Sequence, residues 1–177
     1  MTLTPTPGPD HDPGYLASLR YGVGPLGATR RLVLGLVVAP VPLWLLMPFL
    51  DSARRFPAGA LLLVAGAVIV AMMLGRLVLE TVTPLSPTLG PAVARSRSLV
   101  VFRSQVVFQV VVAQTPIVAG VLLALTTKSP LPWVAGFLLG WPLTLLSLPT
   151  TTIVERLRER LEAYGAQSDL WAALLDE

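Results

Sequence analysis

The sequence predicts an all-α fold, in which four transmembrane helices form a bundle and a cytoplasmic amphipathic helix follows at the C-terminal end. The first observation is composition: 54% of the residues are hydrophobic and 13% are charged, whereas soluble domains carry about a quarter charged residues. The second is a series of apolar runs long enough to cross a bilayer core of roughly 30 Å as helices. The third is a C-terminal segment with apolar residues at helical spacing and charged residues between them.

Proline, glycine and charged residues separate the apolar runs and divide the chain into three segments. Residues 1–28 are predicted to be a disordered or interfacial N-terminal tail, including a short helix at 15–21 that the glycines after it end. Residues 29–149 form a four-span membrane domain, and residues 150–177 form a cytoplasmic amphipathic helical tail. The predicted spans are residues 32–50, 58–79, 99–125 and 131–148.

The first span contains Pro40, Pro42 and Pro48. Proline is tolerated in membrane helices where neighbouring helices or water satisfy the carbonyls that it frees. The three prolines therefore predict a kinked helix, either a bent packing helix or a hinge for gating.

The third span is unusually polar, because it carries Arg103, Gln105, Gln109 and Gln114. Lipid offers these side chains no partner, so the protein must supply one. At 100° per residue, Gln105 and Gln109 share a face, while Gln114 lies roughly opposite Gln105. We expect each glutamine to hydrogen-bond to a neighbouring helix or a partner subunit. A water-filled transport pathway is the alternative.

Small residues predict close helix–helix packing in two spans, by the physics of the GxxxG motif. At the end of the second span, Arg76 and Glu80 are four residues apart and are predicted to form an ion pair. The predicted packing residues are Gly59, Ala67, Ala71 and Gly75 in the second span, and Gly136 and Gly140 in the fourth.

The C-terminal tail predicts an amphipathic helix at residues 153–164, with Val154, Leu157, Leu161 and Tyr164 on its apolar side. Threonine and glutamate three residues apart, at positions 152 and 155, fit a capping box. A second short helix is expected at residues 169–175, with a serine cap at position 168. We expect the helix at 153–164, together with the spans, to bind a second copy of the chain or another membrane protein.

The positive charges predict the orientation of the spans. Ten of the 13 Lys and Arg residues flank the spans on one side and three lie on the other, and positive charge favours the cytoplasmic side. Both termini and the middle loop are therefore predicted in the cytoplasm, with the protein in the plasma membrane, and the arginines are interpreted as topology signals and not as a nucleic-acid site. The three residues of the opposite side are Arg54, Arg55 and Lys128.

The sequence predicts no enzyme. It contains no cysteine and a single histidine, His11, in a Pro- and Gly-rich tail, which excludes thiolate chemistry and disfavours a transition-metal site. The predicted spans carry no acidic residue for general acid–base catalysis. We therefore expect no catalytic residue, no cofactor and no metal.

The polar third span and the tail RLRERLEAYGAQSDLWAALL resemble those of uncharacterised small four-span integral membrane proteins of high-GC Gram-positive bacteria. That resemblance covers most of the chain and implies no activity. The function predicted is a non-catalytic membrane protein that acts by helix association, as a homo-oligomer or as an accessory subunit. The alternative is a small channel or transporter with a polar third span.

Overall fold

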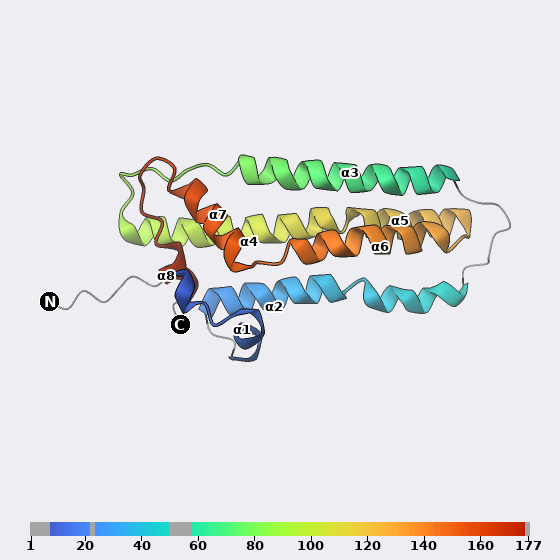
Figure 1. The fold of residues 1–177 in the computed structure, drawn as a ribbon, viewed down its shortest axis with the longest axis horizontal. Coiled ribbons are helices and arrows are strands. Elements are labelled where there is room, and N and C mark those ends of the chain that lie inside the picture. The colour runs from blue at the N-terminus through green and yellow to red at the C-terminus, as the bar shows by residue number, and fades with distance from the viewer. Residues whose placement is uncertain (1–7, 22–23, 50–57, 176–177) are drawn as a thin grey trace. The chain divides into compact units, whose positions relative to one another are not determined.

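The computed structural model describes residues 8–21, 24–49 and 58–175, and over these ranges the chain is helical and has no strand. The prediction of an all-helical fold is therefore confirmed for this part of the chain. The elements in order (Figure 1) are η1 Pro9–His11, α1 Tyr15–Tyr21, α2 Gly24–Val38, η2 Val41–Phe49, α3 Ala58–Glu80, α4 Pro91–Ala113, α5 Thr115–Thr127, α6 Leu131–Leu146, α7 Thr151–Leu161 and α8 Leu170–Leu175.

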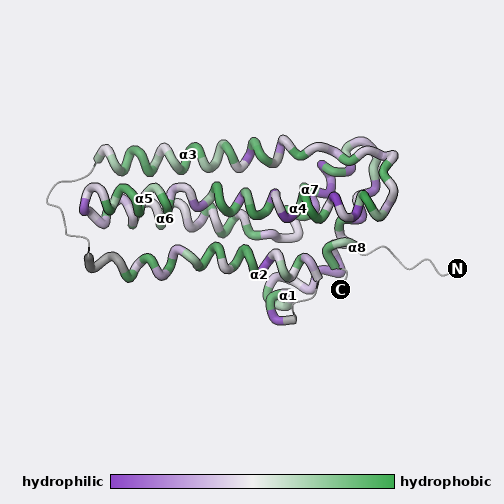
Figure 2. The backbone as a smooth tube through the Cα atoms, turned by 180° about the vertical axis from the view of Figure 1, so that it is seen from behind, coloured by the Kyte–Doolittle hydropathy of each residue, from purple (hydrophilic) through white to green (hydrophobic). Residues whose placement is uncertain are grey.

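Within the described ranges, three helical stretches are long and apolar enough to cross a membrane: Gly24–Leu45, Ala58–Val78 and Pro91–Thr127. Helix α6 meets the same criterion only as a bent pair with α7, so the number of candidate spans is three, or four if that pair counts as one. Figure 2 shows hydrophobic residues along α3 and α5, whereas hydrophilic residues gather in the first half of α4 and in α7.

The chain divides into two compact units. Unit 1 comprises Met1–Val33, Leu79–Val106 and Pro149–Glu177. Unit 2 comprises Leu34–Val78 and Val107–Leu148. In unit 1, α7 buries Val154, Leu157 and Leu161, and α8 is buried over five of its six residues. The apolar side of the tail therefore packs inside a unit that is built from three separate parts of the chain.

The first predicted span is a helix that changes type at its centre. Helix α2 ends at Val38, and a 3₁₀ helix, η2, continues from Val41 to Phe49. Pro40 and Pro42 cause the change because neither has an N–H for the α-helical ladder. The short helix predicted at residues 15–21 is α1, which ends at Tyr21, and α2 begins at Gly24, which takes a φ of +70°. The loop predicted at residues 51–57 lies outside the described residues.

The third predicted span is interrupted. Helix α4 begins at Pro91, where proline suits a first turn, and ends at Ala113; α5 begins at Thr115. Gln114 forms the junction, and its N–H bonds to the carbonyls of Val110 and Val111 at 3.1 and 3.2 Å.

The tail helices differ from the prediction at their ends. Helix α7 ends at Leu161, and Tyr164, expected on its apolar side, is 75% exposed. Glu162 is the C-cap, and its carboxylate accepts hydrogen bonds from the N–H and the hydroxyl of Ser168, at 3.1 and 2.7 Å. The predicted capping box is wrong: the N-cap is Thr150, and its side chain makes no capping hydrogen bond.

Candidate functional site

The polar residues of α4 do not share one environment. Gln105 and Gln109 are 8% and 6% exposed, on the face of α4 that also buries Phe102 and Val106. The Nε2 atom of Gln105 is buried and has no hydrogen-bond partner in the part of the chain that the structure describes, although buried polar groups generally have one. Arg103 is exposed.

Gln114 reaches across to another helix. Its Nε2 donates a hydrogen bond to the carbonyl oxygen of Leu36 in α2. In an uninterrupted helix that carbonyl would accept from the N–H of residue 40, but Pro40 has no N–H. The side-chain amide of Gln114 therefore replaces the backbone donor that Pro40 lacks.

An aromatic row lines the same region of unit 2. Trp133, Phe137 and Trp141 follow one another at four-residue spacing along α6, and Trp44 of η2 packs on the first two with ring centroids 5.7 and 5.1 Å away. The Nε1 of Trp141 donates to the carbonyl of Val37 at 3.4 Å. Trp133 is 1% exposed, and its Nε1 has no partner among the described residues.

The face of α6 next to the aromatic row packs tightly against α5. A Cβ atom added to Gly136 would lie 2.5 Å from the carbonyl oxygen of Pro116 and 3.0 Å from the Cα of Gly120. At Gly140 it would lie 2.7 Å from a side-chain carbon of Ile117. The two predicted packing glycines of the fourth span therefore lie where only a glycine fits (Figure 1 shows α5 and α6 side by side).

The predicted packing residues of α3 lie in different surroundings. A Cβ on Gly59 or Gly75 would meet nothing within 4 Å, whereas Ala71 is 4% exposed and Ala67 is half-buried. The reason is geometric: each four-residue step advances about 40° around the helix, so Gly59 and Gly75 point in nearly opposite directions. These four residues do not form one face.

Unit 1 contains a buried ion pair that the sequence analysis missed. The guanidinium of Arg30 donates to both carboxylate oxygens of Asp12, at 2.8 and 2.7 Å, and their side chains are 1% and 5% exposed. The same guanidinium donates to the Ser18 hydroxyl at 3.0 Å and to the Pro149 carbonyl at 3.2 Å. Arg30, interpreted as a flanking topology signal, thus joins the N-terminal segment, α2 and the chain before α7.

The carboxylate of Asp12 has further donors. The Gly14 N–H bonds to Oδ1 at 3.0 Å, and the Thr151 hydroxyl bonds to Oδ2 at 3.1 Å. The hydrogen bonds from Arg30 hold the pKa of Asp12 below its ordinary value of 3.8, against the effect of burial, which raises it. Burial raises the pKa of Tyr15, whose ring lies 5.2 Å from the Arg30 guanidinium carbon. The turn sequence Asp-Pro-Gly was the one local signal of an ordered carboxylate at position 12.

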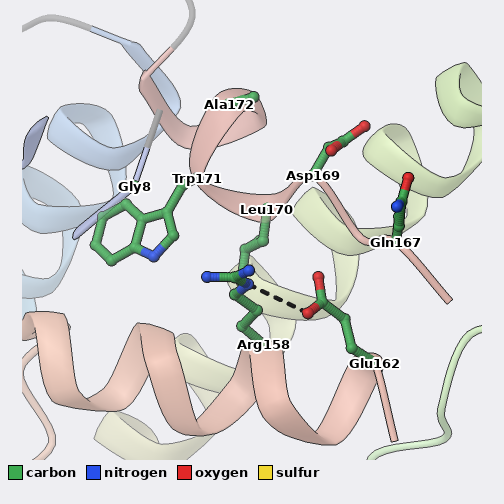
Figure 3. Close-up of a pocket in the computed structure, with 8 residues that line it drawn as sticks. All are labelled: Gly8, Arg158, Glu162, Gln167, Asp169, Leu170, Trp171 and Ala172. Carbon is green, nitrogen blue, oxygen red and sulfur yellow. Dashed lines mark hydrogen bonds and ion pairs between the residues drawn. The ribbon is translucent and has the colours of Figure 1, made fainter. Parts of the chain in front are cut away.

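A polar cavity of about 540 Å³ lies in unit 1 between α7 and the segment that leads into α8 (Figure 3). Arg158 of α7 and Glu162, which follows the helix, line it and pair with each other at 3.2 Å. Trp171 lies on the other side, and its Nε1 donates to the carboxylate of Glu155. Because Glu155 and Glu162 both lie within 4 Å of Arg158, its charge is balanced inside the fold.

One further predicted feature is absent from the described part of the chain. Arg76 and Glu80 are both exposed, and no ion pair joins them. No group of three or more His, Cys, Asp or Glu residues there could hold a metal ion. The polar contacts described above gather at three places, around Arg30 and around Arg158 in unit 1 and around Gln114 in unit 2.

The chain matches no known protein family, no curated protein and no solved structure.

Proposed function

We propose that the protein is a multi-pass protein of a bacterial cytoplasmic membrane that acts by helix association and not by catalysis, as a homo-oligomer or an accessory subunit. The observation that carries this proposal is the exposure of α3. Only 11% of its apolar window is buried within the chain, against 39% and 44% for the other two candidate spans. Lipid or a partner helix must cover the remainder.

Helix α3 has one face turned to its own chain and another left open. Ala60, Val64 and Ala71 are at most 8% exposed. On the opposite side Leu62, Ile69 and Met73 are 74%, 59% and 68% exposed, at the spacing of one helix face. Gly66 lies within this open face, and a Cβ there would meet nothing within 4 Å. A glycine between large apolar residues allows a second helix backbone to approach closely.

Contacts inside unit 1 support four crossings with both termini in the cytoplasm. Asp12 bonds to Thr151, and the Leu85 N–H bonds to the carbonyl of Leu161 at 2.9 Å. Segments that hydrogen-bond outside a bilayer lie on the same side of it, so the chain crosses an even number of times between them. Two crossings before Leu85 and two after it satisfy this condition, and the predicted excess of arginines gives the side.

The length of α4 and α5 supports a later start for the third span. Residues 91–127 of a continuous helix would measure about 55 Å, and a bilayer core is roughly 30 Å thick. We infer that the membrane-embedded part is the C-terminal portion that contains Gln114. The exposed Arg103 then lies outside the apolar core, where its charge is solvated.

A channel or transporter remains the second candidate function, favoured by one observation. The break between α2 and η2 and the break between α4 and α5 meet at the Gln114–Leu36 hydrogen bond, and interrupted helices mark substrate sites in many transporters. The association function is favoured over it because the broken backbone is satisfied by side chains of the protein.

Native mass spectrometry of the purified chain in lipid nanodiscs tests the association function. We expect a discrete multiple of the 18.9 kDa chain, or a second protein bound in fixed ratio. Gly66→Leu should shift the mass towards the single chain. Gly75→Leu is the matched control, since Gly75 lies nine residues and about 180° away on the same helix and is also unobstructed. A single chain in every lipid, together with solute flux in vesicles, would favour the transporter.

A further inference from the structure

The change of helix type between α2 and η2 lies inside a candidate membrane span, Gly24–Leu45. The last α-helical bond before it runs from the Ala39 N–H to the Gly35 carbonyl at 2.9 Å. The next turn is 3₁₀, with the Leu43 N–H bonded to the Pro40 carbonyl at 3.2 Å. Between these points Pro40 and Pro42 supply no N–H, so the backbone of this span has no continuous hydrogen-bond ladder.

Two side chains from other helices bond to the carbonyls at this break. Gln114 donates to Leu36, and Trp141 donates to Val37 at 3.4 Å. Both donors occupy irregular places themselves: Gln114 joins α4 to α5, and Trp141 precedes Pro142, which lies inside α6. The change of helix type in the first span is therefore held by side-chain donors, which can separate from a carbonyl without breaking any backbone ladder.

We propose that residues 38–41 form a hinge in the first span, and that hydrogen bonds from the Gln114 amide and the Trp141 indole hold the hinge in the conformation that the structure shows. A backbone carbonyl in an apolar medium needs a donor. While the hydrogen bonds from Gln114 and Trp141 are formed, the carbonyls of Leu36 and Val37 each have a donor. When these two hydrogen bonds break, water or another polar group must donate to the two carbonyls. Opening of the hinge is therefore coupled to entry of a polar partner. This inference concerns the motion of one span and does not depend on the association function.

The two ends of the hinge can be followed by distance measurements between spin labels. Leu34 and Leu45 lie on either side of the break and are 37% and 76% exposed, and the chain has no native cysteine. In a straight helix the two Cα atoms would be about 17 Å apart. Double electron–electron resonance on Leu34→Cys/Leu45→Cys in phosphatidylcholine nanodiscs gives the distribution of distances for each variant.

We expect one dominant distance in the wild-type background and a second population, or a clearly broader distribution, with Gln114→Leu. Trp141→Phe removes the indole N–H but keeps a ring stacked on Phe137, and it should broaden the distribution less. Gln109→Leu is the control, because Gln109 is buried on α4 but makes no hydrogen bond to α2. If Gln114→Leu leaves the distribution unchanged, the break is a rigid kink and the proposal is overturned.

A second background keeps the test decisive if Gln114→Leu alone fails to fold. Pro40→Ala restores a backbone N–H that can bond to the Leu36 carbonyl, so Gln114 becomes redundant. We expect Pro40→Ala to give a single narrow distribution and Pro40→Ala/Gln114→Leu to match it. If the double variant is broader than Pro40→Ala, Gln114 acts on something other than the carbonyl that Pro40 frees, which contradicts the proposal.

Discussion

Both carboxylate oxygens of Asp12 accept hydrogen bonds from the terminal nitrogens of Arg30, and the pair is almost completely removed from solvent. The pair lies at the start of the first candidate span and ties it to the N-terminal segment. An exposed ion pair contributes little to stability, but removing one partner of a buried pair leaves a desolvated charge.

Asp12→Asn should lower the free energy of unfolding by about 3–5 kcal/mol, because Arg30 keeps its charge and loses its counter-ion. Unfolding by titration with SDS in mixed micelles measures the change. Asp10→Asn is the matched control: Asp10 is exposed on the same segment, and its replacement should change stability by less than about 0.5 kcal/mol. Equal effects of the two substitutions would show that the pair does not stabilise the fold.

Low pH should reduce the free energy of unfolding, because it protonates the carboxylate of Asp12. The pKa of Asp12 is lower in the folded chain than its ordinary value of 3.8, mainly because Arg30 donates hydrogen bonds to it. A depressed folded pKa contributes stability that is complete above the unfolded pKa and is lost as the pH falls through the folded pKa. The difference in unfolding free energy between wild type and Asp12→Asn should be constant above about pH 5 and should shrink below 3.8. A difference that is unchanged down to pH 2.5 would contradict the assignment.

Gly136→Ala should destabilise the protein by about 1–3 kcal/mol, because the new methyl group would overlap the backbone of α5. Gly75→Ala should be neutral or stabilising by up to about 1 kcal/mol, since its methyl group enters open space and alanine favours a helix. Melting temperatures in one detergent compare the two. The same loss at both positions would mean that α3 packs as closely as α6 does.

Cysteine labelling in intact cells should separate three crossings from four. Lys128, Ser86 and Gln167 are exposed, and the chain has no cysteine of its own. With four crossings, Lys128→Cys should react with an impermeant thiol reagent from outside, and Ser86→Cys and Gln167→Cys should react only after the membrane is opened. Labelling of Lys128→Cys and Gln167→Cys from the same side would rule out a crossing by α6.

Local features of the fold were predictable from the sequence because they depend on near neighbours. The glycine pair predicted to pack in the fourth span faces a tight helix contact. Gln114 was expected to hydrogen-bond to a neighbouring helix, and it bonds to α2. In each case the residue type and its position in the helical pattern are enough to predict the contact.

Other features needed the three-dimensional structure because they join distant segments. Nothing in the spacing of Asp12 and Arg30 shows that they pair, since the N-terminal segment has no apolar period. The tail helix was expected to bind a second copy of the chain or another membrane protein. Its apolar residues Val154, Leu157 and Leu161 are buried inside unit 1. An amphipathic pattern shows that a helix has something to bury and does not identify what covers it.

The way unit 1 is assembled also sets the order in which a ribosome can complete it. Asp12 is synthesised 139 residues before Thr151, to which it hydrogen-bonds, a delay of roughly 7–30 s at about 5–20 residues per second. The pair with Arg30 can form early, but the Pro149 and Thr151 contacts must wait until the last apolar helix has left the ribosome. A truncated chain without residues 149–177 would leave the Ser98 hydroxyl without the Ser168 carbonyl to which it donates. Premature termination should therefore yield a chain in which unit 1 is unfinished, and its uncovered segments should be cleaved by proteases more readily than in the full chain.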